Sequence, residues 1–127
     1  MNIKKMITGL VISMLLNSGT ANADWGDVYY CQMTNSFGIT PEGEKKNYIL
    51  EKFQFKLDQT KNAMVYGSTG VFQDVVHELA TGSNWPSQER WYANDTFSMV
   101  YFEKGKILLT QNGSSGIFAI SADCEKF

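Results

Sequence analysis

The sequence predicts an all-β protein, a single antiparallel domain of about eight strands folded as an up-and-down barrel or a curled sandwich. Apolar and polar residues alternate with period two over much of the chain, which is typical of half-buried strands. Stretches rich in Gly, Asn and Asp separate these segments at short, regular spacing. The only two cysteines, Cys31 and Cys124, lie far apart in the 127-residue chain and predict one disulfide bond.

The N-terminal segment has the three parts of a secretory signal peptide. A lysine pair precedes an apolar run from Ile7 to Leu16, and Ala21-Asn22-Ala23 supplies the cleavage pattern. A membrane crossing needs about 20 apolar residues, so a retained anchor is the weaker interpretation. We therefore expect residues 1–23 to be removed as a signal peptide and 24–127 to form a disulfide-stapled β domain, periplasmic or secreted.

The charge of the mature chain argues against nucleic acid. Without the leader's two lysines, nine Lys and Arg face thirteen Asp and Glu, a net charge of about −4. Nucleic-acid binding needs clustered cations, and the basic doublet Lys45-Lys46 follows Glu42 and Glu44 in a polar segment. No apolar run after the leader approaches membrane-spanning length. The expected partner is an unidentified protein, glycan or small molecule.

The N-terminal strands follow from their alternation. A first strand is predicted over Val28–Thr34, and a second over Tyr48–Leu57 after a polar loop. The second strand would place four apolar residues inward: Ile49, Phe53, Phe55 and Leu57. Glu51 interrupts this row and indicates a strand end or a bulge. Asp58–Asn62 is predicted to turn, and Ala63–Tyr66 to return as a short strand.

The C-terminal third repeats the pattern. Glu103-Lys104-Gly105 is predicted as a hairpin turn, because glycine permits a positive φ, and 112–116 as another. Strands are predicted over Arg90–Asn94, Thr96–Phe102, Lys106–Gln111 and Ile117–Cys124. In a closed barrel the first and last strands are neighbours, so the spacing of the cysteines and the strand count support each other.

The segment 71–82 fits two structures. On a strand, Val71, Val75 and Leu79 share one face. A helix over 71–80 would also gather an apolar stripe and could end at Gly82. The valine-rich composition and the surrounding strands favour a strand, with a short helix at 71–80 as the alternative.

The sequence marks no catalytic or metal site. Asp74, His77 and Glu78 would share one face of a helix, but on a strand His77 points away from both carboxylates. We therefore expect no metal and no cofactor. Neither glycine-serine turn has the pattern of a nucleophile elbow, and no spacing distinguishes one pair of carboxylates. The expected function is non-enzymatic.

Aromatic residues are the candidate ligand-binding groups. Four are predicted near strand ends or loops: Trp25, Trp85, Trp91 and Tyr92. Aromatics in such places can stack on sugars or anchor a partner protein, and they can equally cover the open end of a barrel.

The C-terminal third carries Trp91-Tyr92-Ala93, a glycine turn at Gly105 and the ending Ala122-Asp123-Cys124-Glu125-Lys126-Phe127. With the leader and the early Cys31, it resembles short exported proteins of marine bacteria that have no assigned function. This resemblance implies a shared fold and compartment, and no activity.

The layout of Tyr30-Cys31 and Cys124 is also similar to that of the periplasmic C-type lysozyme inhibitors, small β-barrels with a disulfide near both chain ends. Their serine-glycine motif and tryptophan-lysine-glycine stretch are matched here only by Gly67-Ser68 and Lys104-Gly105, so no site residue is carried over. We expect an exported, non-enzymatic β domain that binds a ligand or an envelope partner. The alternatives are a periplasmic inhibitor of a wall-degrading enzyme and a small hydrolase that uses a carboxylate.

Overall fold

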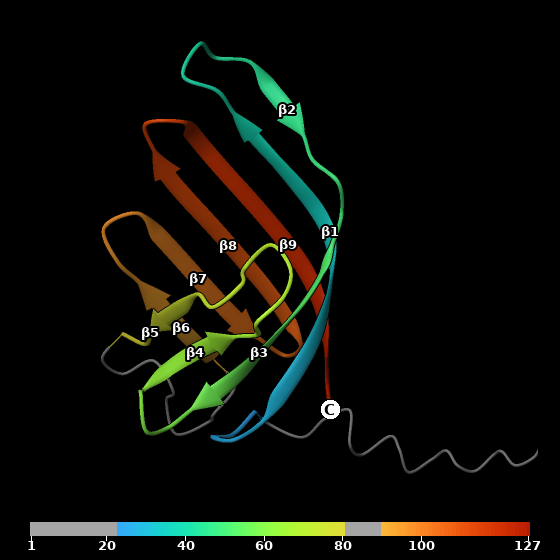
Figure 1. Cartoon of the computed structure of the whole chain (residues 1–127), viewed down its shortest axis with the longest axis vertical. Helices are drawn as coiled ribbons and strands as arrows, with labels where there is room; N and C mark the ends of the chain where they lie inside the picture. The colour runs from blue at the N-terminus through green and yellow to red at the C-terminus, as the bar shows by residue number, and fades with distance from the viewer. Residues whose placement is uncertain (1–22, 81–89) are drawn as a thin grey trace, which may run out of the picture.

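The computed structural model describes residues 23–80 and 90–127. The predicted leader up to residue 22, and Trp85, lie outside the described residues. The described parts contain strands and turns, and no helix. The strands are β1 (Val28–Ile39), β2 (Lys45–Asn47), β3 (Lys52–Asp58), β4 (Ala63–Tyr66), β5 (Val76–Glu78), β6 (Arg90–Asn94), β7 (Ser98–Glu103), β8 (Lys106–Gly113) and β9 (Gly116–Lys126) (Figure 1).

All nine strands belong to one antiparallel sheet in the order β5-β4-β3-β1-β9-β8-β7-β6, with β2 pairing β1 beyond the end of β3. The two ends of this sheet approach each other. A bridge joins Leu79 to Ala93, and the Ala80 N–H donates to the Tyr92 carbonyl at 2.8 Å. The sheet is therefore a nearly closed up-and-down barrel, which confirms the predicted fold class and selects the barrel over the sandwich.

The strands β1 and β9 form the longest pairing, and the disulfide lies within it. Cys31 and Cys124 are direct register partners with Cα atoms 4.0 Å apart and are joined by the predicted disulfide bond. The first and last strands of the barrel are thus neighbours, as predicted. The chain end also follows β1, because the Phe127 N–H donates to the Val28 carbonyl at 2.8 Å.

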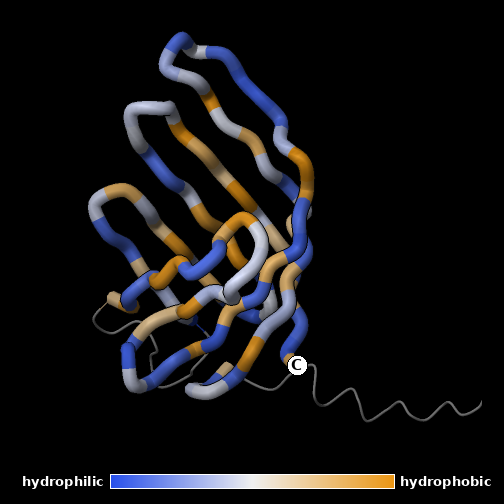
Figure 2. The backbone as a smooth tube through the Cα atoms, in the orientation of Figure 1, coloured by the Kyte–Doolittle hydropathy of each residue, from blue (hydrophilic) through white to orange (hydrophobic). Residues whose placement is uncertain are grey.

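Aromatic side chains fill the barrel. Apolar and polar residues alternate along the strands, as the changing colours of Figure 2 show. The ring of Tyr29 lies 5.4 Å from that of Phe55 and 4.8 Å from that of Phe102. From the loop between β4 and β5, Phe72 packs edge-on against Phe53 at 5.0 Å. Burial of these rings, together with that of the aliphatic core residues, supplies the apolar area that stabilises the fold.

The predicted strand Tyr48–Leu57 is wrong in its first half. Residues 48–51 leave the sheet between β2 and β3, and Ile49, predicted inward, is 81% exposed. The Tyr48 N–H still donates to the Ser36 carbonyl, and the Met33 N–H to the Glu51 carbonyl, so the segment is attached to β1 at both ends. Between them β1 carries an irregularity in its register with β9, at Met33/Asn35, and β1 itself continues to Ile39 instead of ending at residue 34.

The segment 71–80 forms neither a long strand nor a helix. Residues 71–74 turn, Asp74 takes a φ of 59°, and only Val76–Glu78 extend as β5. The predicted strands Ala63–Tyr66 and Arg90–Asn94 match β4 and β6 in their bounds. The predicted turn at Lys104-Gly105 has positive φ at both residues, 53° and 78°, as a two-residue hairpin requires.

Candidate functional site

The predicted aromatic residues do not share one exposed surface. Trp91 is 0% exposed in the barrel core, and Trp25 packs edge-on against it with ring centroids 5.0 Å apart. Tyr92, the next residue of β6, points to the outer face and is half-buried. Successive side chains of a strand face opposite ways, so Trp91 and Tyr92 cannot serve one site. Trp91 lies in the interior, Trp25 is partly buried against the core, and Trp85 lies outside the described residues.

Asp74, His77 and Glu78, the residues considered as a metal candidate, do not come together in the structure. His77 points into the barrel, and its Nδ1 lies 3.2 Å from the Tyr66 hydroxyl. Burial lowers the pKa of His77, and the charge of Asp95 partly opposes this. Asp74 and Glu78 are exposed. Within residues 23–80 and 90–127, no three His, Cys, Asp or Glu side chains gather closely enough to hold a metal ion.

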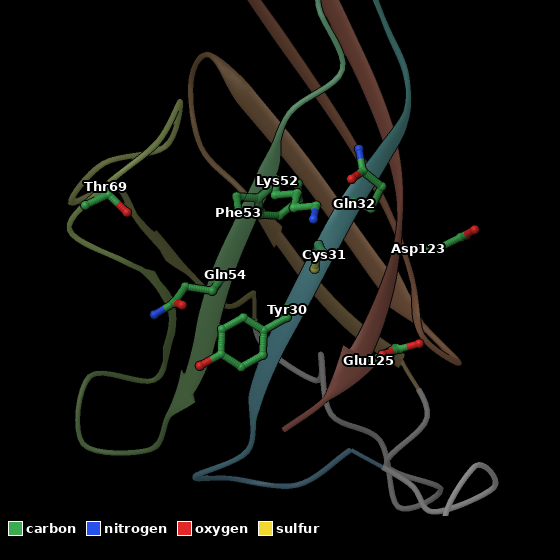
Figure 3. A pocket seen from close by; sticks show the side chains of 9 residues that line it. All are labelled: Tyr30, Cys31, Gln32, Lys52, Phe53, Gln54, Thr69, Asp123 and Glu125. Atoms are coloured by element: carbon green, nitrogen blue, oxygen red, sulfur yellow. The ribbon is translucent and has the colours of Figure 1, made fainter.

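A groove of about 480 Å³ lies on the outer face of β3, β1 and β9. Figure 3 shows Thr69 at one side, Asp123 and Glu125 at the other, and the side chains of β1 and β3 between them. The outward side chains that line it are Tyr30, Gln32, Lys52, Gln54, Asp123 and Glu125. Cys31 of β1 and Phe53 of β3 also line the groove, although their side chains are buried. We refer to this site as the groove.

The strand register arranges the outward side chains of the groove in two rows. One row crosses the three strands as Lys52, Gln32 and Asp123, and the next crosses them as Gln54, Tyr30 and Glu125. Neighbouring strands lie about 4.8 Å apart, and outward residues on one strand about 6.6 Å apart. The groove therefore presents a compact grid of polar groups with one aromatic ring.

Several of these polar groups are free to meet a ligand. The Gln32 amide nitrogen donates to the Met33 carbonyl at 3.1 Å, and its amide oxygen is the acceptor that it can offer a ligand. Lys106 holds Asp123 through a 2.6 Å ion pair. Lys52 and Glu125 form no ion pair among the described residues. Tyr30 is 46% exposed and contacts the ring of Phe127 at 5.3 Å, so an aromatic pair borders the groove.

The loop wall of the groove approaches β3 closely at Gly67. The Gly67 N–H donates to the Gln54 carbonyl at 3.1 Å, which attaches the loop that carries Thr69 to β3. A Cβ added at Gly67 would lie 2.9 Å from Cγ of Gln54. A side chain at position 67 would therefore have to displace the exposed side chain of Gln54, which lines the groove.

Sequence reasoning missed this groove. The alternation identified Lys52 and Gln54 as outward residues of a strand, which is the ordinary position of a solvated side chain. Their association with Asp123 and Glu125 depends on the pairing of β1 with β9, in which Gln32 meets Asp123 and Tyr30 meets Glu125, residues more than 90 positions apart. The signal that could have found it was the disulfide, because joining Cys31 to Cys124 as register partners places Tyr30 beside Glu125.

No protein-family model, curated protein or solved structure matches this chain. In the part of the chain that the structure describes, no helix has the length and hydropathy that a membrane crossing requires.

Proposed function

We propose that this protein is an exported, non-enzymatic binding domain that recognises a short polar glycan in the groove. The observation that carries the proposal is the grid of Gln, Lys, Asp and Glu side chains around the exposed ring of Tyr30. Sugars present apolar ring faces and a dense set of hydroxyls. An aromatic ring can cover the first, while amide and charged groups hydrogen-bond the second.

The carboxylates of the groove support binding better than hydrolysis. In glycosidases the general acid sits in an environment that keeps it protonated, commonly an apolar pocket. The Asp123 side chain is 59% exposed and bonded to Lys106, and Glu125 is also exposed. Both are better suited to accept hydrogen bonds from hydroxyl or amino groups of a sugar.

Calorimetric titration tests the proposal with two defined probes, chitotetraose and cellotetraose, on the oxidised chain 24–127. We expect at least one to bind, and Tyr30→Ala to weaken that binding at least tenfold. Tyr48→Ala is the matched control, because Tyr48 is 47% exposed, against 46% for Tyr30, and does not line the groove. Equal losses in both variants, or no heat from either probe at millimolar concentration, would refute the glycan proposal.

Inhibition of a wall-degrading enzyme is a second candidate. It is supported by the barrel with a disulfide between its first and last strands, the layout that the lysozyme-inhibitor resemblance implies. A lysozyme turbidity assay with the oxidised protein tests it. Loss of lysis at an equimolar ratio would support inhibition, and full lysis at tenfold excess would exclude it for that enzyme.

A further inference from the structure

The outer surface of the barrel is divided by a row of charges. Register partners place six side chains side by side across six strands, in the order Lys52, Gln32, Asp123, Lys106, Glu103 and Arg90. Beyond Gln32 the signs alternate, and Lys106 and Asp123 form an ion pair. Opposite charges on neighbouring strands stabilise such a row. The groove lies at the β3–β1–β9 end of this row.

On the other side of the row lies an extended face without charge. Its segments are 35–39 of β1, 117–121 of β9, 108–112 of β8, 97–101 at β7 and 92–94 of β6, and none contains Asp, Glu, Lys or Arg. We call their outward side chains the uncharged face. The upper ends of β1, β8 and β9 in Figure 1 extend beyond the part of the barrel covered by β3, β4 and β5.

Large apolar side chains cover this face. Five are about half exposed or more: Ile39 at 43%, Phe97 at 63%, Met99 at 49%, Leu108 at 54% and Ile117 at 53%. They form two groups, because Leu108 is the register partner of Tyr101 and Ile117 is that of Ile39. Small or neutral polar residues separate the two groups: Thr110, Asn112, Ala119 and Ser121. Large exposed apolar groups joined by uncharged residues in this way mark an interaction site.

The area of the uncharged face suits a dimer. Apolar side chains of this size offer on the order of 150 Å² of surface each, at the low end of the aromatic range, so five that are about half exposed leave on the order of 400 Å². The partly exposed aromatics Phe37, Tyr92 and Tyr101, with the neutral polar residues between them, bring the face to on the order of 800 Å². A standard interface buries about 800 Å² on each partner.

We propose that the uncharged face is a homodimer interface, in which the same faces of two copies pack sheet on sheet. Interface cores are depleted of charged residues, and a partner with charges at this position would have to desolvate them unpaired. A second copy offers an equally uncharged surface, because a two-fold interface brings identical patches together. Twisted sheets pack in this manner at about 30° to each other.

The charge distribution favours a second copy over a lipid surface. Surface binding to anionic lipid needs an excess of cations beside the apolar face. The bordering row instead alternates in sign, and its Asp123 is bonded to Lys106. On the far margin, Lys45 is held 5.2 Å above the Phe37 ring. Lys45, the register partner of Ile39, therefore borders the face with one positive charge, while the five segments of the face itself contain no charged residue.

Light scattering after size-exclusion chromatography tests the proposal on the oxidised chain 24–127. The wild type should show twice the chain mass at about 50 μM and should keep it in 0.5 M NaCl, because the interface is apolar. Leu108→Asp should be monomeric and should keep the far-UV circular dichroism spectrum of the wild type. The substitution should raise the dissociation constant of the dimer at least 100-fold. Met99→Asp, a second outward position, should behave alike.

Leu50→Asp is the matched control, since Leu50 is 48% exposed and lies off the uncharged face. It should stay dimeric, with a dissociation constant within threefold of the wild type. A monomeric wild type at 50 μM would overturn the proposal, and so would a dimer that Leu50→Asp dissociates while Leu108→Asp does not. Binding of the monomer to vesicles of neutral or anionic phospholipid would overturn it in favour of a lipid surface. Titration of the monomeric variant with the glycan probes tests the groove independently, so failure of the dimer proposal can be told apart from failure of the glycan proposal.

Discussion

Removal of the disulfide should destabilise the barrel strongly without changing its fold. Cys31 and Cys124 are 93 residues apart in sequence, and closing a loop of that length removes about 4–5 kcal/mol of chain entropy from the unfolded state. The native strands β1 and β9 are also joined by a ladder of register partners on both sides of the bond. That ladder should keep them paired in the folded double variant Cys31→Ala/Cys124→Ala.

The variant should therefore lose about 4 kcal/mol of unfolding free energy, which is a large part of the 5–15 kcal/mol typical of a small domain. Urea unfolding followed by tryptophan fluorescence measures the loss, because Trp91 is buried in the folded core. With an m-value of 1–3 kcal/mol/M, the midpoint should fall by about 2 M. Wild type treated with reductant is the control and should give the same midpoint as the variant. A loss below about 1 kcal/mol in both would refute the reasoning.

Three further perturbations test the fold and the expected export. Burial lowers the pKa of His77, so the unfolded chain binds a proton at this residue more readily than the folded chain. The unfolding free energy should therefore fall as the pH drops below about 6.5, and this fall should end once the pH is below the pKa of His77 in the folded state. His77→Gln should flatten this slope between pH 7.5 and 5, and an unchanged slope would contradict the assignment. Gly116→Ala should lower the unfolding free energy by about 1–3 kcal/mol, because Gly116 has a φ of 112° and an added Cβ would meet the Ile39 carbonyl. Gly113→Ala, across the same turn, is the control and should leave the thermal melt close to that of the wild type. The intact mass of the exported chain should be that of a chain beginning at Asp24. The Asp24 nitrogen lies 2.8 Å from an Asp27 carboxylate oxygen, so cleavage there would place the new ammonium beside that carboxylate. A mass that retains residues 1–23 would contradict export by cleavage.

The sequence was sufficient for the elements in which local pattern and tertiary environment agree. Arg90–Asn94 alternates cleanly and forms β6 with the predicted bounds, and glycine at position 105 identified the β7–β8 turn. Cys31 and Cys124 predicted the neighbouring first and last strands. In each case a short-range signal or a covalent constraint specified the structure.

The failures have non-local causes. Ile49 continues the apolar row of Phe53 and Phe55, but the chain steps off β1 between β2 and β3, and only the pairings of 45–47 and 52–56 with β1 reveal this. Trp91 was a candidate for a ligand because tryptophan serves both cores and sites, and its alternation with Tyr92 does not tell which of the two faces inward. The groove combines β3 with β9, whose proximity follows from the pairing of both strands with β1.

The most direct test of the proposed binding site is a ¹H–¹⁵N correlation spectrum of the labelled chain 24–127 titrated with chitotetraose and with cellotetraose. The account predicts that binding shifts the amide signals of β1 around Tyr30 to Gln32, β3 around Lys52 to Gln54, and β9 around Asp123 to Glu125, while those of 108–112 stay in place. Shifts confined to the uncharged face or to the barrel end near Trp25, or no shifts with either sugar at millimolar concentration, would contradict it.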